Sequence, residues 1–141
     1  MSDDGKRNGS CFCGAVKFLI PNAISSYTAC HCGTCRKWGS GPLLSTDCGR
    51  DVSFEGEENI LRYKSSDWAE RGFCKCCGSS LFYYVIPSGS YLMSVGLFED
   101  QNGLKMTNQV FIDEKPDCYT FATQTKTMTG AEVFAMFAPQ D

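Results

Sequence analysis

The chain has 141 residues, 43% of them hydrophobic, so it is expected to bury a core and to fold as one globular domain over residues 1–141. Its net charge of −3 and pI of about 5.1 argue against nucleic acid or an anionic membrane as the main partner. No apolar run approaches the roughly 18 residues of a membrane span. The polar N-terminus has no apolar stretch typical of a signal peptide, so a cytoplasmic location is expected.

Short strands dominate the predicted elements. Alternating or continuous apolar runs that end at Pro, Gly or Asn are typical of strands. In chain order, the predicted strands are residues 10–20, 42–46, 51–55, 60–64, 81–86, 91–98 and 109–112. The turn at residues 87–90 predicts a hairpin between the fifth and sixth of these strands.

One helix is predicted near the C-terminus. Thr129 and Glu132 have the spacing of a capping box, in which each side chain bonds the backbone of the other, and Pro139 is expected to end the helix. The positions expected to pack on the core are Val133, Phe134, Met136 and Phe137. Short strands with a single helix indicate an all-β domain with minor helix.

Ten cysteines need an explanation in a reducing compartment, and metal binding explains them better than disulfides. Because His31 is the only histidine, a site built from several histidines is excluded. Sites rich in thiolate favour zinc, and the spacing lacks the run of an iron–sulfur ferredoxin. No βαβ pattern supports a disulfide-exchange role for a Cys-x-x-Cys pair.

Two of the cysteine clusters complement each other. Cys74 and Cys77, followed by Gly78, form the C-x2-C-G half of a closed zinc site. Cys11 and Cys13 are the natural second half, which would make a four-thiolate structural site between distant segments. Of the remaining cysteines, three are expected to be ordinary core or surface residues: Cys48, Cys76 and Cys118.

The middle cluster, Cys30, Cys32 and Cys35, offers three thiolates within six residues. Three protein ligands and one open position are typical of catalytic zinc. Two alternatives remain open at this point. Cys48 or Cys118 could complete a second closed site, or His31 could replace one of the cysteines.

At these clusters the chain resembles the glutathione-dependent formaldehyde-activating enzyme family. The matching segments are residues 9–16, 30–37 and 71–78, with looser matches at 63–66, 95–100, 110–112 and 115–116. The resemblance implies a tent-like all-β fold of several small antiparallel sheets stapled by zinc. It also implies a structural zinc on Cys11, Cys13, Cys74 and Cys77, and a second, exchangeable zinc on Cys30, Cys32 and Cys35. Two positions depart from the family pattern: Gln109 stands where the family has histidine, and Cys118, followed by Tyr119, where it has tryptophan.

The implied activity is that of a zinc-dependent carbon–sulfur lyase or synthase. It would join a thiol such as glutathione to an aldehyde such as formaldehyde, giving an S-hydroxymethyl adduct. Zinc could deprotonate the thiol or polarise the carbonyl. Arg36 and Lys37 could attract the carboxylates of the thiol, although a solvated surface pair is the better interpretation of these residues. The alternatives are a thiol carrier that does no catalysis and a redox-sensing module.

Overall fold

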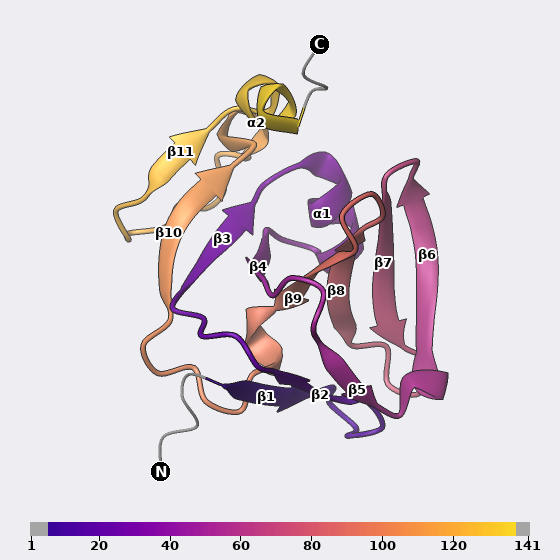
Figure 1. Cartoon of the computed structure of the whole chain (residues 1–141). Helices are drawn as coiled ribbons and strands as arrows, with labels where there is room; N and C mark the ends of the chain where they lie inside the picture. The colour runs from indigo at the N-terminus through magenta and orange to yellow at the C-terminus, as the bar shows by residue number, and fades with distance from the viewer. Residues whose placement is uncertain (1–5, 138–141) are drawn as a thin grey trace. The chain divides into compact units, whose positions relative to one another are not determined.

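The computed structural model describes residues 6–137, which form two compact units. The first unit holds the chain up to Ser25 together with Ser45–Leu104. The second holds Ser26–Leu44 together with the chain from Lys105 onward (Figure 1). The expected β-rich fold of several sheets with a short C-terminal helix is confirmed, while Pro139 lies outside the described residues. Within residues 6–137, no helix combines the length and apolar character needed to cross a membrane.

The first unit consists of antiparallel strands in two groups, with the orders β1-β2-β5 and β4-β9-β8-β7-β6. Their bounds are β1 Arg7–Ser10, β2 Lys17–Ile20, β4 Leu43–Asp47, β5 Ser53–Glu55, β6 Ile60–Ser66, β7 Ala69–Cys74, β8 Ser80–Val85 and β9 Ser90–Ser94. The part of β4 from Ser45 onward belongs to this unit. Two 3-10 turns, Glu57–Asn59 and Val95–Leu97, complete it.

The first unit tests three of the strand predictions made from the sequence. The hairpin between the fifth and sixth predicted strands is confirmed, because β8 pairs with β9 in antiparallel register. The predicted strand over 91–98 is too long, since the chain turns into a 3-10 helix at Val95. The predicted strand over 10–20 is correct only at Ser10 and over its last four residues, which form β2. β1 ends at Ser10, β2 begins at Lys17, and the intervening residues form a turn that contains the first two cysteines.

The core of the first unit centres on Phe82, which is fully buried on β8. Its ring meets Tyr91 edge-on at 4.9 Å between ring centroids, and the guanidinium carbon of Arg62 lies 5.0 Å from its centroid. Directly across the ladder, β7 places Gly72 opposite Phe82. A β-carbon at Gly72 would lie 2.3 Å from the Phe82 ring, so only glycine leaves room for this aromatic side chain.

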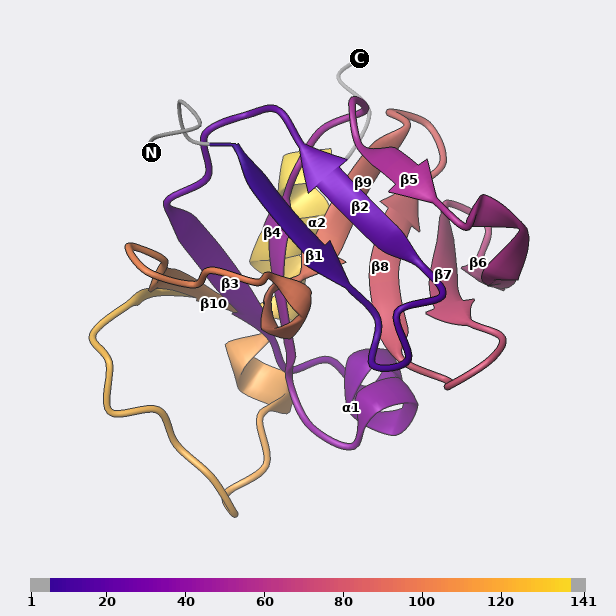
Figure 2. The same ribbon diagram turned by 90° about the horizontal axis from the view of Figure 1, so that it is seen from below.

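The second unit contains three neighbouring strands in the order β11-β10-β3 (Figure 1). Both pairs of neighbouring strands are parallel, so the expectation of antiparallel sheets does not extend to this unit. Figure 2 shows the long segment that leaves the 3-10 turn after β10 and returns at β11. The bounds are β3 Ser26–Cys30, α1 Gly33–Gly39, β10 Lys105–Val110, a 3-10 turn Ile112–Glu114, β11 Lys126–Met128 and α2 Gly130–Phe137.

Helix α2 begins with the predicted capping box. The Thr129 hydroxyl accepts from the backbone N–H of Glu132 at 3.1 Å, and the Glu132 carboxylate accepts from the N–H of Thr129 at 2.8 Å. The expected core packing of this helix is wrong for two of its apolar residues. Phe134 is 57% exposed and Met136 63% exposed, although the Phe134 ring still contacts Phe111 edge-on.

We predict that Gly72→Ala destabilises the protein by about 1–3 kcal/mol, because its new methyl group overpacks the core against the Phe82 ring. Chemical denaturation of equally metal-loaded protein measures the change. Gly96→Ala is the matched control, since a β-carbon there meets nothing within 4 Å. Equal stability of the two variants would contradict this account of the core.

Candidate functional site

Two hairpin turns of the first unit carry the first group of cysteines. Cys11 and Cys13 lie in the turn between β1 and β2, and Cys74 and Cys77 lie where β7 turns toward β8. Each turn is closed by a backbone hydrogen bond from a glycine to the first cysteine of its pair. Gly78, like its counterpart in the other turn, has a positive φ, which residues with a β-carbon rarely adopt. The glycine after each pair therefore shapes the turn that presents the thiols.

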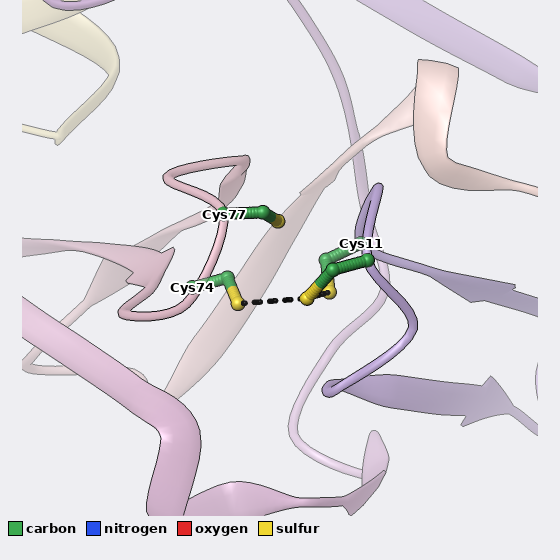
Figure 3. A group of neighbouring side chains, drawn as sticks. Cys11, Cys74 and Cys77 are labelled. Carbon is green, nitrogen blue, oxygen red and sulfur yellow. Dashed lines mark hydrogen bonds between the residues drawn. The ribbon is translucent and has the colours of Figure 1, made fainter.

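The sulfur atoms of these four residues converge, as Figure 3 shows for Cys11, Cys74 and Cys77. All four lie within 4.8 Å of one another. The Cys11–Cys13 and Cys13–Cys74 sulfur distances are 3.7 and 3.9 Å. Zinc–sulfur bonds of about 2.3 Å in a tetrahedron put sulfurs about 3.8 Å apart. The group has the size and donor chemistry that zinc requires.

Backbone amides stabilise negative charge on two of these sulfurs. The N–H of Val16 donates to the Cys11 sulfur, and the N–H of Cys76 donates to the Cys74 sulfur, each at 3.3 Å. Cys76 itself is exposed and stands outside the group, as expected. Burial opposes the shift, but backbone hydrogen bonds from Cys77 and Cys76 lower the pKa of Cys74.

The four thiols cannot all ionise without a counter-charge. Hydrogen bonds from the Ser79 side chain and backbone lower the pKa of Cys77 to about 5. A backbone hydrogen bond from Ala15 also lowers the pKa of Cys13, but burial and the neighbouring thiols raise it to about 12. One thiolate therefore suppresses the next, and a bound cation would remove this penalty.

The second group lies in the second unit, where β3 leads into α1. Cys30 ends β3, Cys32 is the N-cap of α1, and Cys35 is buried in the first turn of that helix. The Cys32 sulfur accepts from the N–H of Cys35 at 3.3 Å. The three sulfurs lie within 4.8 Å of one another. Shared hydrogen bonds with Cys32 and Cys35, together with burial, raise the pKa of Cys30.

The structure bears on the alternatives for this group. Cys118 is exposed, Cys48 is buried, and neither joins the three sulfurs among the described residues. Cys48 donates to the carbonyl of Thr46, and burial raises its pKa to about 12, so it remains a protonated thiol. All ten cysteines lie in the described part of the chain and are free thiols, so disulfides are not formed there.

His31 also remains outside the metal group, because both of its ring nitrogens already have partners. Nε2 lies 2.7 Å from the Gln109 side-chain oxygen, and Nδ1 lies 2.9 Å from the Tyr119 hydroxyl. Burial lowers the pKa of His31, which keeps the ring neutral. Arg36 donates from Nε to the His31 carbonyl at 2.9 Å, so this guanidinium supports the loop, whereas Lys37 is exposed.

Sequence reasoning missed the neighbourhood of this histidine. The sequence marks Gln109 and Cys118, which precedes Tyr119, only as departures from the family pattern. No spacing connects them, or Lys115 and Thr125, to the cysteines. These residues lie about 80 positions from His31, and no local spacing joins them. Only the parallel pairing of β3 with β10 brings the two segments together.

Comparison with known proteins decides the family. A family model described as glutathione-dependent formaldehyde-activating enzyme matches residues 6–114. The chain belongs to this family. An uncharacterized lyase of Schizosaccharomyces pombe is 38% identical over 126 residues, which cover 89% of this chain and 92% of that protein.

One further relative and one solved structure are more distantly similar to this chain. A Halomonas elongata protein named "putative glutathione-dependent formaldehyde-activating enzyme" is 29% identical over 85 residues, 54% of each chain. A crystal structure of a Rhodobacter sphaeroides protein has a TM-score of 0.56 and 24% identity, and the match covers 71% of this chain and 99% of that one. That structural likeness supports the fold alone.

The two groups predict different responses to the loss of one ligand. We expect Cys32→Ser to lower bound zinc from two per chain to one with only a modest loss of melting temperature, because serine can still cap α1. Cys77→Ser should fold poorly, since structural zinc supplies on the order of 10 kcal/mol where a site forms only on folding. Metal analysis and thermal melting measure both effects. An equal collapse of the two variants would mean that both groups are structural.

Proposed function

We propose that residues 1–141 act as one zinc domain that makes or breaks a carbon–sulfur bond between a thiol and an aldehyde. Glutathione and formaldehyde are the proposed substrates, and an S-hydroxymethyl thiol is the product. The observation that carries the proposal is the unequal size of the two cysteine groups, four and three. A tetrahedral metal is complete with four thiolates and one ligand short with three.

The four-cysteine group is proposed to be structural. Cys11 and Cys13 would hold one side of a zinc ion, and Cys74 and Cys77 the other. The site would join two hairpins that are 61 residues apart at Cys13 and Cys74. Four thiolates would complete the tetrahedral coordination of zinc, which favours a closed site.

The three-cysteine group is proposed to be the reaction site. Cys30, Cys32 and Cys35 would hold the second zinc, which when bound would supply an acidic position for a substrate thiol or carbonyl oxygen. The chain's own contribution is to fix the three sulfurs: Cys30 through its strand, Cys32 through its capping bond, and Cys35 through burial. Family membership supports a thiol and an aldehyde as the reacting pair.

We predict that zinc-loaded protein accelerates adduct formation between glutathione and formaldehyde above the uncatalysed rate. Exchange spectroscopy by NMR at equilibrium measures this rate directly, because free thiol, hydrated aldehyde and adduct interconvert. Metal-free protein and Cys30→Ser should return the rate to background. Cys118→Ser is the matched control, since this exposed thiol lies outside both groups, and it should keep the acceleration.

The result separates an enzyme from a carrier. Binding of glutathione without any acceleration at saturating thiol would overturn the enzyme proposal and leave a zinc-stabilised thiol carrier. Acceleration that persists in Cys30→Ser would overturn the assignment of the three-cysteine group as the reaction site.

A further inference from the structure

The 3-10 turn after β10 carries two adjacent carboxylates that reach two different helices. Asp113 Oδ1 accepts from the backbone N–H of Gly130 at 2.7 Å, and Gly130 is the first residue of α2. Glu114 Oε1 accepts from the backbone N–H of Gly33 at 2.9 Å, and Gly33 is the first residue of α1. One short turn therefore bonds to the N-termini of both α1 and α2.

The bond from Gly33 to Glu114 supplies an acceptor that the start of α1 lacks. The first N–H groups of a helix have no partner within the helix itself. The first turn of α1 contains no acidic residue, and the sulfur of its N-cap residue, Cys32, accepts from the N–H of Cys35. Glu114, 81 positions away along the chain, provides the acceptor for the N–H of Gly33.

Cys32 is consequently held from both sides by one segment of the chain. The residue before it, His31, donates its backbone N–H to the Val110 carbonyl at 3.1 Å, and the residue after it donates to Glu114. Between these two acceptors the chain turns at Phe111, whose φ of 55° lies in the left-handed region that residues with a β-carbon rarely adopt. This turn leads the chain out of β10 and toward α1. The position of the Cys32 sulfur therefore depends on contacts with this distant segment.

Helix α1 is too short to hold its own N-terminus. It has seven residues, and helices of this length are unstable without tertiary contacts. It also begins with Gly33, and glycine has the greatest backbone freedom of all residues. Cys30 is fixed independently, because β3 pairs with β10 at this residue. Loss of the bond to Glu114 would thus free the Cys32 sulfur while the Cys30 sulfur stays in place.

We infer that Glu114 is a positioning residue of the three-cysteine group. It fixes the peptide between Cys32 and Gly33, so that the three sulfurs stay within reach of one zinc ion. The inference rests on the proposed function, in which this group holds the second zinc. Partners that orient metal ligands without binding the metal typically change metal affinity by 10- to 100-fold. Because Glu114 bonds to the backbone beside a ligand, we expect an effect of about tenfold.

The test measures how well zinc protects each cysteine. Zinc-loaded protein is treated with iodoacetamide, and mass spectrometry follows the modification of each thiol over time. In Glu114→Ala, the members of the three-cysteine group should react about tenfold faster than in wild type, because more of this group is free of zinc at any moment. The four-cysteine group should react at the wild-type rate. Cys118, which is exposed and outside both groups, is the internal reference.

Two further variants separate this role from a general loss of stability. Glu114→Gln should restore the wild-type rates, since its amide oxygen can still accept from Gly33. Asp113→Ala is the matched control, because it removes the same kind of bond at α2, and it should leave the three-cysteine group protected. The inference is overturned if Glu114→Ala reacts like wild type, if it exposes both cysteine groups equally, if Glu114→Gln does not rescue it, or if Asp113→Ala has the same effect.

Removal of the donor tests the same bond from its other end. Gly33→Pro has no N–H, proline is favoured at the first position of a helix, and Cys32 already has the extended backbone that a following proline requires. A β-carbon at this position meets its nearest neighbours only at 3.8 Å. In the Gly33→Pro background, Glu114→Ala should no longer change the reactivity of the three cysteines. A further tenfold increase there would show that Glu114 acts in some other way and overturn the inference.

The two proposals fail in different ways. If wild type accelerates adduct formation but Glu114→Ala leaves the three cysteines protected, the proposed function stands and the role of Glu114 is lost. If Glu114→Ala exposes only these three cysteines but wild type gives no acceleration, the role of Glu114 stands in a zinc-binding thiol carrier and the enzyme is lost.

Discussion

The close approach of four sulfur atoms on two hairpin turns is the constraint on which the first unit depends. Cys13 and Cys74 are 61 residues apart, yet their sulfurs lie 3.9 Å from each other. Packing alone gives no reason to gather four ionisable thiols, because each thiolate raises the pKa of the next. The lowered pKa of Cys77 and the raised pKa of Cys13 express this conflict. A bound divalent cation would resolve it. The tight turns that bring the four sulfurs together need glycine at a positive φ.

The three-cysteine group is arranged on a different principle. Its members fall within six residues, and a strand end, a helix cap and the first helical turn already define their positions. Its formation therefore does not require distant segments to be joined by metal. A group that is local and supported by the backbone can exchange a ligand without unfolding its unit, which suits a reaction site. The long-range group of the first unit lacks this freedom.

Local patterns in the sequence predicted the features that depend on neighbouring residues. The capping box at Thr129, the hairpin of β8 and β9, and the C-x2-C-G turn at Cys74 are all of this kind. Helix α1 was missed because it is only seven residues long, contains glycine at both ends and has no apolar stripe. β7 was missed because Glu70, Arg71 and Gly72 interrupt its apolar pattern, although the ladder and the Phe82 ring require the glycine.

The features that the sequence could not predict are those that parallel pairing creates. β3 and β10 are separated by more than 70 residues, and only their register places Gln109 beside His31. In an extended segment successive side chains point to opposite sides. Cys30 and Cys32 bring their sulfurs within 4.8 Å of each other, whereas both ring nitrogens of His31 lie against Gln109 and Tyr119. The histidine between these two cysteines is for this reason a poor metal ligand. It instead connects the cysteine segment to β10 and to the loop that carries Tyr119.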